Sequence, residues 1–359
     1  MKIESIETPA LIVEKELMES NQRILERMIS ESGLNLFPHY KSHKCAELAR
    51  WQMSRGAAGI TCAKLGEAED LAAARIPRIV LANQVVQTEK LPKLAQVAAQ
   101  CDLTVCADDP DNVRQLEQAL AGYSASRQEP VQLRVLVEYE VGMRRCGVDT
   151  SEECLALARL ISAQPHLRFD GIQAYAGHIS HEKDPVRRRS ELLRIEEKVR
   201  LLKEFLEKNG VPVANVCGGS TGYAAEKPRQ SVYTQMQAGS YLFMDQTYQG
   251  LKLAFQQALF VLTTVVSVRP DHIVVDTGLK SLTMDQDAPC FAAYPDAVLD
   301  FSEEHTSLRI PGAGHSLGEK LRCVPGHCCT TVNLYDKMYF VEGTEVTDIR
   351  PVTSRGRSQ

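Results

Sequence analysis

The sequence predicts an α/β protein, a (β/α)8 TIM-like barrel with a C-terminal antiparallel β-domain. Short apolar runs that favour β-structure recur eight times in the first part of the chain. Amphipathic, helix-like segments lie between these runs. Such alternation favours parallel βα units, and eight of them favour a closed barrel. After about Leu253 the helix-like segments stop and β-favouring runs follow one another.

Each predicted barrel unit begins with a short strand. The strands are expected at residues 35–39, 59–62, 78–81, 102–106, 133–138, 171–175, 213–218 and 236–241. The helices between them are expected at residues 46–53, 66–75, 88–99, 111–120, 151–161 and 187–208. An open, doubly wound sheet is the alternative arrangement, because it is built from the same βα units.

The last third of the chain reads as a separate β-domain. No clear helix lies among its β-favouring runs, which are residues 260–268, 271–276, 332–335, 337–341 and 345–350. We therefore expect a barrel over residues 10–253 and a β-domain made of residues 1–9 and 254–359. Residues 8–13 are expected to begin in the β-domain before the chain enters the barrel.

Composition and charge argue against several classes of function. The 359 residues carry a formal charge of −5, so the chain has no basic footprint for nucleic acid. No apolar run is long enough to span a bilayer, and the first residues lack the apolar core of a signal peptide. A cytoplasmic protein without membrane contact is expected. Its 11 cysteines are then expected to be reduced, buried or metal-binding, and not to form a disulfide framework.

Residues 37–44 read Phe-Pro-His-Tyr-Lys-Ser-His-Lys and follow a predicted helix. If this stretch is a β-strand, His39, Lys41 and His43 share one face, because successive side chains of a strand point to opposite sides. A lysine between two imidazoles suggests a reactive group. An exposed, polar strand end has the same pattern, so the stretch alone does not decide between the two interpretations.

Two glycine-rich turns with hydroxyl side chains follow the seventh and eighth predicted strands. Active sites of (β/α)8 barrels lie at the C-terminal ends of the strands, and the loops after strands seven and eight often bind phosphate. Glycine lets backbone N–H groups approach an anion, and serine and threonine add donors. Ordinary turns are the alternative. The candidate phosphate-binding residues are Ser220, Thr221, Gly222, Gly239, Ser240 and Tyr241.

A lysine and a phosphate site in one barrel suggest pyridoxal phosphate held by Lys41 as a Schiff base. Arg145 follows the fifth predicted strand and is the candidate partner of the pyridine nitrogen. Because a guanidinium does not give up its proton, such a partner would leave that nitrogen unprotonated. An arginine on the surface at a strand end is the alternative for Arg145.

His327 and Cys329 are two residues apart, so on an extended segment they point the same way. An imidazole and a thiolate make half of a zinc site and leave positions open for substrate and water. A coincidental spacing is the alternative. His178 and His181 lie in one loop after the sixth predicted strand, where they are either functional or ordinary packing and surface histidines.

With these motifs together, the sequence resembles the D-threonine aldolase/D-serine dehydratase family of fold type III pyridoxal-phosphate enzymes, which share an alanine racemase-like barrel. The resemblance covers nearly the whole chain. The lysine motif and the C-terminal His-x-Cys are its most specific parts. The stretches that carry it are residues 7–11, 38–44, 59–69, 327–329 and 331–336.

The resemblance implies a barrel and a β-domain in a homodimer whose active sites lie near the interface. It implies that Lys41 forms the Schiff base, that Arg145 is the partner of the pyridine nitrogen and that Tyr175 contacts the cofactor. The six residues of the glycine-rich turns would surround the phosphate. His327 and Cys329 would bind a divalent metal, and His181 would lie near the substrate hydroxyl. Thiolate favours zinc over manganese or magnesium, which stay possible.

Both activities of the family act on β-hydroxy-D-amino acids. In dehydration, Lys41 removes the α-proton and the metal makes the β-hydroxyl a better leaving group, which yields a 2-keto acid and ammonia. In retro-aldol cleavage, a base such as His181 deprotonates the hydroxyl, which yields glycine and an aldehyde. In the family that the sequence resembles, the aldolases carry a His-x-Asp motif at the metal. The dehydratases for D-serine and 3-hydroxy-D-aspartate carry His-x-Cys.

Cys329 therefore favours dehydration, although residues 331–336 look as much like the aldolases. Two further alternatives belong to other classes. Barrel proteins of this fold type that bind pyridoxal phosphate for cofactor homeostasis, without a known reaction, lack the β-domain and the His-x-Cys pair. An alanine racemase would need a second base on the opposite face of the cofactor, and it would leave the metal pair without a role.

Overall fold

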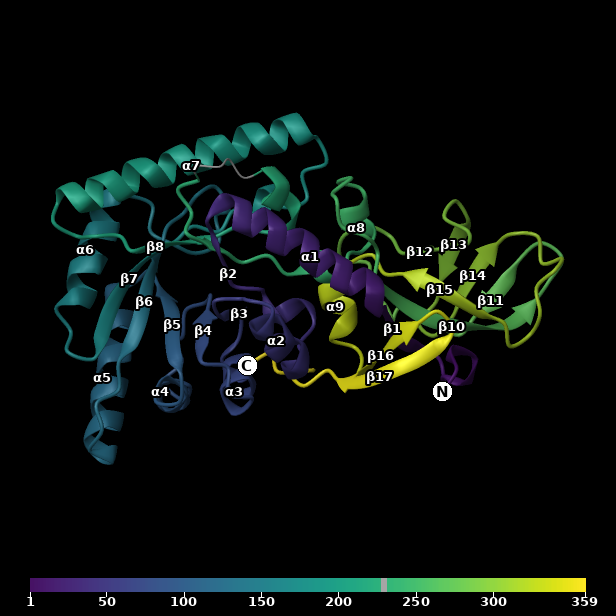
Figure 1. Cartoon of the computed structure of the whole chain (residues 1–359), viewed down its shortest axis with the longest axis horizontal. Coiled ribbons are helices and arrows are strands. Elements are labelled where there is room, and N and C mark those ends of the chain that lie inside the picture. The colour runs from purple at the N-terminus through teal and green to yellow at the C-terminus, as the bar shows by residue number, and fades with distance from the viewer. Residues whose placement is uncertain (227–230) are drawn as a thin grey trace. The chain divides into compact units, whose positions relative to one another are not determined.

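The computed structural model describes residues 1–226 and 231–359 (Figure 1). The chain forms two compact units, and each is described by itself. The barrel unit consists of residues 26–41, 46–239 and 357–359. The β unit consists of residues 1–25, 42–45 and 240–356. The domain boundaries expected from the sequence stay a prediction.

The barrel unit contains a ring of parallel strands. Its sheet has eight strands in the order β2-β9-β8-β7-β6-β5-β4-β3. The strands are β2 (Asn35–Leu36), β3 (Ile60–Cys62), β4 (Arg78–Leu81), β5 (Asp102–Ala107), β6 (Leu133–Glu138), β7 (Leu167–Gln173), β8 (Asn215–Gly218) and β9 (Gln235–Met236).

Backbone hydrogen bonds join the two ends of this sheet. Ala58 N donates to Leu36 O at 2.8 Å, and Thr61 N donates to Pro38 O at 2.9 Å. These bonds link the segment that continues from β2 to the segment of β3. The predicted eight-stranded barrel is therefore confirmed, and the open sheet is wrong.

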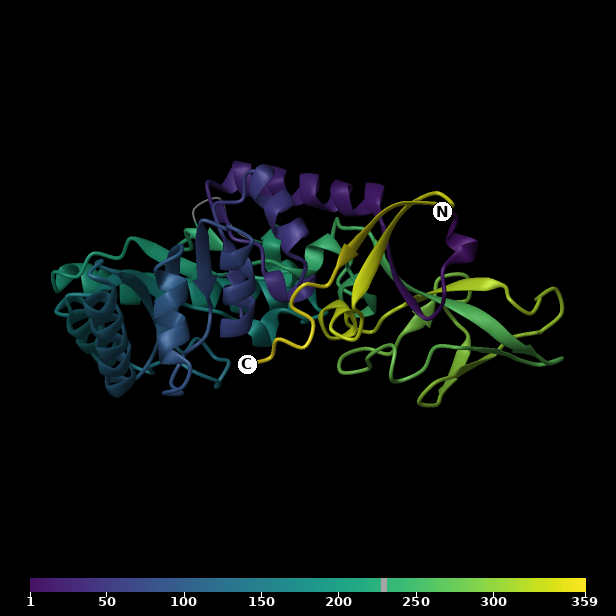
Figure 2. The ribbon, with the colours of Figure 1, turned by 90° about the horizontal axis from the view of Figure 1, so that it is seen from below.

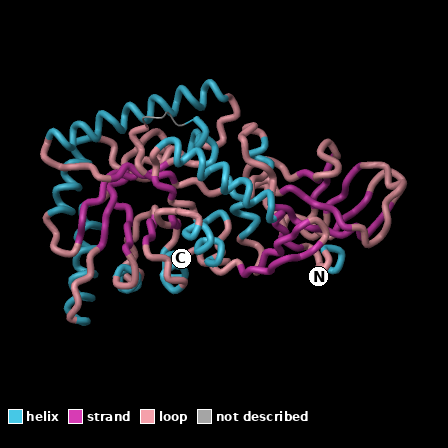
Figure 3. Tube along the Cα trace, in the orientation of Figure 1, coloured by secondary structure: helices cyan, strands magenta, loops and turns pink. Residues whose placement is uncertain are grey.

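Helices on the outside of the ring connect successive strands, as Figures 1 and 3 show for the strands β3 to β8. They are α2 (Ala46–Ser54), α3 (Leu65–Ala73), α4 (Leu91–Ala98), α5 (Pro110–Arg127), α6 (Ser151–Ser162) and α7 (Pro185–Lys208). Helix starts have clear local causes. Asp109 and Asp184 accept bonds from the first N–H groups of α5 and α7, and Thr150 forms a capping box with Glu153 at α6.

Apolar side chains fill the inside of the ring. One core cluster consists of Phe37, Val80, Cys106, Leu136 and Cys217, all of them buried. These side chains come from segments far apart in the sequence. The ring is thus a packed core and not a pore, and it leaves its strand ends as the place for a site.

The strand predicted over residues 35–39 is too long, and the shared face of His39, Lys41 and His43 is wrong. β2 ends at Leu36, and Tyr40–Ser42 form a 3-10 turn, η2. The Nδ1 atom of His39 accepts from Lys41 N at 3.5 Å. Lys41 N thus bonds to a side chain of its own segment, as in local turns. The eighth predicted strand is also shorter, because Ser240–Leu242 form the 3-10 turn η5.

The β unit is built around a mixed sheet of nine strands. The main order is β13-β14-β11-β10-β1-β16-β17, and β15 pairs with β10 and β12. Among the described pairs of this sheet, only β1·β16 is parallel, so the predicted antiparallel domain is confirmed with that exception. Figure 2 shows β16 and β17 in yellow, side by side as a hairpin. The strands are β1 (Ala10–Glu14), β10 (Leu259–Val268), β11 (Ile273–Val275), β12 (Cys290–Phe291), β13 (Val298–Phe301), β14 (Thr306–Arg309), β15 (Lys320–Val324), β16 (Lys337–Glu342) and β17 (Glu345–Pro351).

Short helices interrupt the β unit. The expected strand over residues 332–335 is wrong, because Cys328–Val332 form the helix α9, which ends there. A second short helix, α8 (Gln246–Gln249), lies between η5 and β10. The helix α1 (Lys15–Ser32) follows β1, and the turns η1 (Ile3–Ser5), η3 (Gly177–Ile179) and η4 (Thr221–Glu226) complete the described helical segments. None of the described helices combines the length and the apolar character that crossing a membrane requires.

Candidate active site

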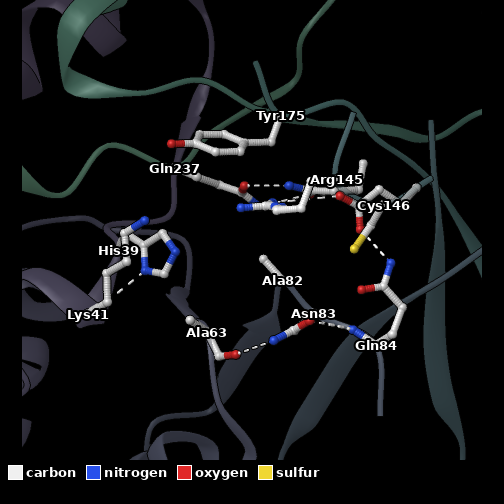
Figure 4. A pocket seen from close by; sticks show the side chains of 12 residues that line it. His39, Lys41, Ala63, Ala82, Asn83, Gln84, Arg145, Cys146, Tyr175 and Gln237 are labelled. Atoms are coloured by element: carbon white, nitrogen blue, oxygen red, sulfur yellow. Dashed lines mark hydrogen bonds and ion pairs between the residues drawn. The ribbon is translucent and has the colours of Figure 1, made fainter. Parts of the chain in front are cut away.

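A cavity of about 170 Å³ lies at the C-terminal ends of the barrel strands (Figure 4). The positions of its lining residues in the chain explain this location. Glu138 ends β6, Gln173 ends β7, and Ala82 directly follows β4. In a (β/α)8 barrel this end carries the functional groups. The lining residues are His39, Lys41, Ala63, Ala82, Asn83, Gln84, Glu138, Arg145, Cys146, Gln173, Tyr175 and Gln237.

Three of the predicted site residues, Lys41, Arg145 and Tyr175, meet in this cavity. The Nζ atom of Lys41 lies 5.8 Å from the centroid of the Tyr175 ring, and Cζ of Arg145 lies 5.5 Å from the same centroid. Figure 4 shows Lys41 with His39 on one side of the cavity and Arg145 with Cys146 on the other. The cavity is therefore rich in positive groups arranged around one aromatic ring.

Glu138 balances part of this positive charge. Its Oε1 lies 3.8 Å from Nη2 of Arg145, and its Oε2 accepts from Nε2 of Gln84 at 2.6 Å. Burial raises the pKa of Glu138, although the hydrogen bond from Gln84 and the charge of Arg145 act in the opposite direction. The carboxylate thus provides a fixed acceptor beside the guanidinium. Glu138 and Gln84 were not predicted as site residues, although Glu138 ends a predicted strand and Gln84 closely follows one.

Amide side chains shape the rest of the cavity. Asn83 Nδ2 donates to Ala63 O at 2.9 Å, and Asn83 Oδ1 accepts from Gln84 N at 3.0 Å. Gln173 and Gln237 exchange two hydrogen bonds, of 2.9 and 3.2 Å. These bonds hold the wall in one conformation. Gln173 ends β7, and Asn83 and Gln237 lie one or two residues beyond β4 and β9, so a position at a strand end is the signal that these side chains share.

The turn after β8 carries three of the candidate phosphate residues. Ser220 is buried, and its hydroxyl has no hydrogen-bond partner among the residues that the structure describes. Such a group costs free energy unless a ligand satisfies it, so it fits an oxygen-rich anion such as a phosphate. Thr221 begins η4. A Cβ on Gly222 would come within 1.7 Å of Ser180 O, so the turn requires glycine at that position.

The other phosphate candidates follow β9. Gly239 ends the long segment of the barrel unit, and Ser240 begins η5 in the β unit. The Tyr241 hydroxyl donates to Gln22 Oε1 at 2.6 Å, and Ser240 Oγ lies 3.6 Å from Cys329 Sγ. Both hydroxyls therefore have partners within the β unit.

His327 and Cys329 do not lie on an extended segment, so the reason predicted for their proximity is wrong. His327 is extended, but Cys328 begins α9, and His327 is its N-cap. The helix start curls the chain, and the donor atoms of His327, Cys328 and Cys329 all lie within 4.8 Å of one another. A nitrogen and a thiol sulfur at this separation fit the donors that zinc prefers. Cys328 was not predicted, although it stands between the two.

Asp245 completes the surroundings of the pair. Its Oδ2 lies 2.9 Å from His327 Nδ1 and accepts from Cys328 N at 2.8 Å. The sulfur of Cys329 lies 3.4 Å from Ser42 Oγ. Burial lowers the pKa of His327, but the charge of Cys329 and the hydrogen bonds to Asp245 and Cys329 raise it to about 11. His327 and Cys329 are thus partly buried, and each contacts a polar neighbour, Asp245 at His327 and Ser42 at Cys329.

The two histidines after β7 lie apart from the described lining of the cavity. His178 belongs to η3, and the half-buried His181 lies in the turn that follows. Neither is among the described residues that line the cavity. The role predicted for His181 stays a prediction.

Two family models match the chain in succession. Residues 13–247 match the N-terminal domain of alanine racemase, and residues 258–341 match the putative serine dehydratase domain. The chain is 37% identical to a D-threonine aldolase of an Arthrobacter species, over 99% of this chain and 94% of that protein.

Solved structures extend the comparison. The structure of D-threonine aldolase from Filomicrobium marinum superposes with a TM-score of 0.94 at 33% identity, and the match covers 100% of this chain and 98% of that one. A mutant D-threo-3-hydroxyaspartate dehydratase in its metal-free form superposes with a TM-score of 0.83 at 26% identity, and the match covers 98% and 99% of the two chains. The likeness to both kinds of protein thus extends over the whole chain.

Proposed function

The chain belongs to the D-threonine aldolase/D-serine dehydratase family, with its alanine racemase-like barrel, and from this premise we propose that it dehydrates a β-hydroxy-D-amino acid with the help of pyridoxal phosphate and a divalent metal. At the coarser level it is a pyridoxal-phosphate-dependent lyase acting on D-amino acids. The substrate of the proposed reaction is of the D-serine or 3-hydroxy-D-aspartate type. The products are a 2-keto acid and ammonia.

The observation that carries the proposal is the group of Lys41, Arg145 and Tyr175 around one cavity. Pyridoxal phosphate, when bound, withdraws electrons from the bonds to Cα of an amino acid. Lys41 would hold its aldehyde carbon, and Ser220 would donate to its phosphate. Arg145 keeps its own proton, so it would leave the pyridine nitrogen unprotonated. Glu138 Oε1 lies 3.8 Å from Nη2 of this guanidinium.

The proton at Cα needs a base, and the Lys41 amine would serve as that base when it is not bonded to the cofactor. A metal bound by His327 and Cys329 would supply a Lewis acid for the β-hydroxyl. The Cys329 sulfur contacts Ser42 at 3.4 Å, and Ser42 follows Lys41 in the chain. The imidazole and thiolate donors support zinc over manganese or magnesium.

Retro-aldol cleavage to glycine and an aldehyde is the second candidate. It is favoured by the 37% identity to a D-threonine aldolase and by the TM-score of 0.94 with another. Dehydration is favoured by Cys329, because the family resemblance associates a cysteine there with dehydratases and an aspartate with aldolases. A single ligand position thus supports our choice between the two reactions.

One experiment separates the candidates. The purified protein is incubated with D-serine, D-threonine and D-threo-3-hydroxyaspartate, each with and without a chelator. We expect a keto acid and ammonia, and we expect the chelator to suppress both. Glycine and an aldehyde would overturn dehydration, and the absence of any turnover or metal requirement would support a cofactor-binding protein of homeostasis instead.

A Cys329→Asp variant sharpens this experiment, because it installs the ligand type that the resemblance associates with aldolases. We expect it to lose ammonia release with 3-hydroxyaspartate and to gain glycine release. An unchanged product ratio would contradict the role of Cys329 in the choice of reaction.

We also expect a homodimer, as the family resemblance implies. Light scattering on the purified protein would contradict this if it gave the mass of one chain.

A further inference from the structure

We propose that Asp245 is a positioning residue for the metal pair, because its carboxylate holds the His327 ring in the tautomer and orientation that present Nε2 to a divalent cation. The proposal rests on the proposed function of His327 and Cys329 as metal ligands. It concerns a residue that stands 82 positions from His327 in the sequence. All the contacts that carry it lie within the β unit.

Asp245 uses both of its oxygens for N–H groups. It has no exposed surface. Its Oδ1 accepts from Tyr248 N at 2.9 Å, while its Oδ2 accepts from Cys328 N at 2.8 Å and lies 2.9 Å from His327 Nδ1. An ionised carboxylate can only accept, so the short contact with the imidazole requires a proton on Nδ1.

This proton decides which nitrogen of His327 can bind a metal. When Nδ1 carries the hydrogen that points to Asp245, Nε2 is the nitrogen left for a cation. A histidine that binds a metal commonly gives its other N–H to a carboxylate, which fixes the ring and makes the ligating nitrogen more basic. Asp245 has the chemistry and the geometry of such a partner.

The backbone around Asp245 makes the arrangement rigid. Asp245 is the N-cap of α8, and the first residues of α8 bond to the turn that precedes His327. Gln246 N donates to Pro325 O at 3.1 Å, and Thr247 donates to Gly326 O through its N–H at 3.3 Å and its hydroxyl at 2.9 Å. The start of α8 and the turn before α9 therefore form one hydrogen-bonded assembly, with the imidazole fixed at its edge.

A purely structural role would need only the bonds from two backbone N–H groups, Tyr248 N to Oδ1 and Cys328 N to Oδ2. Capping uses the bond from Tyr248 N to Oδ1, and asparagine caps helices about as well as aspartate. The other oxygen serves only His327 and Cys328 among the described residues. Asp245→Asn separates the two roles, because an amide nitrogen facing Nδ1 would favour the opposite tautomer, with a hydrogen on Nε2.

The test measures the affinity of the full-length, pyridoxal-phosphate-loaded protein for Zn²⁺ by competition with a chromophoric chelator. We expect Asp245→Asn to raise the dissociation constant by about 10- to 100-fold, the range found for partners of metal-bound histidines. We expect the melting temperature without metal to stay close to that of the unchanged protein. Asp245→Ser, which also caps helices but brings no amide nitrogen, should weaken Zn²⁺ binding as well.

Asp276→Asn is the matched control. This carboxylate also lies in the β unit and accepts from Thr263 Oγ1 at 2.6 Å and Thr264 N at 2.7 Å, among residues other than the metal pair. We expect it to leave the affinity for Zn²⁺ unchanged. Unchanged affinity in both Asp245 variants would overturn the positioning role, and so would an equal loss in Asp276→Asn.

His327→Ala separates the failure of this proposal from the failure of the proposed function. If His327→Ala abolishes Zn²⁺ binding while Asp245→Asn does not weaken it, only the role of Asp245 is wrong. If the unchanged protein does not bind Zn²⁺, or His327→Ala binds it equally well, the metal function is wrong and the role of Asp245 is wrong with it.

Discussion

Replacing Ser220 with alanine should have opposite effects on the cofactor-free protein and on cofactor affinity. The Ser220 hydroxyl is buried, and no described residue gives it a hydrogen-bond partner. Without ligand, burial therefore removes water from the hydroxyl, and no hydrogen bond from a described residue compensates for the lost hydration. With a phosphate beside it, the same hydroxyl would donate to a charged oxygen.

The size of both effects follows from hydrogen-bond energetics. An unsatisfied buried polar group costs about 1–3 kcal/mol, so Ser220→Ala should leave the cofactor-free protein equally stable or stabilise it by up to that amount. A hydrogen bond to a charged group contributes about 1.5–3 kcal/mol. Its loss should weaken pyridoxal phosphate binding by about 10- to 150-fold.

The assay combines thermal melting of the cofactor-free protein with a titration of pyridoxal phosphate into it. Thr104→Val is the matched control, because Thr104 is also a buried hydroxyl without a partner in the described part of the barrel unit. It should stabilise the protein without changing cofactor affinity. Unchanged affinity in Ser220→Ala, or equal weakening in Thr104→Val, would refute the assignment of Ser220 to the phosphate.

Three further predictions test other parts of the site and fold. Borohydride reduction should attach the cofactor to Lys41, as peptide mass spectrometry can detect, and Lys41→Ala should lose this label while Lys64→Ala keeps it. Burial raises the pKa of Glu138 above 4.5, so its ionised form weakens folding. Glu138→Gln should therefore have a higher melting temperature than the unchanged protein near pH 7. This difference should vanish below about pH 4.5, where the carboxyl is protonated in the folded and the unfolded state. A difference that persists there would contradict the burial argument. In Gly171→Ala the new Cβ would lie 1.9 Å from Asn215 O, at a φ of +135°, so the pairing of β7 with β8 should fail and soluble protein should be lost. Gly210→Ala is the control, because Gly210 lies in open space at a φ of +79°. It should lower the free energy of unfolding by about 1–2 kcal/mol in melting experiments.

The strand positions could be read from the sequence because local patterns decide them. Alternating apolar strands and amphipathic helices led to an eight-stranded ring, and β4 and β6 have the predicted bounds. Lys41 and Arg145 could be proposed together because each follows a strand, and all strand ends meet at one end of a barrel. The role of Tyr175 came from the family resemblance.

Local conformation at the site was less predictable. His39 and Lys41 were expected on a strand, but the His39 side chain accepts from the Lys41 backbone in a 3-10 turn. His327 and Cys329 were expected on an extended segment, but a helix begins between them. In both places a spacing of two residues led to the proposed site residues, although the backbone differs from the extended one expected.

The sequence by itself determined the kind of fold and led to the proposed reactive groups, because periodicity and residue type are local properties. Only the tertiary structure decided which polar side chains support those groups. Glu138 reaches Gln84 across 54 residues, and Asp245 reaches His327 across 82. Such pairs depend on how distant segments pack. The local sequence around a carboxylate at the end of a strand or the start of a helix does not identify the partner that it contacts in the folded protein.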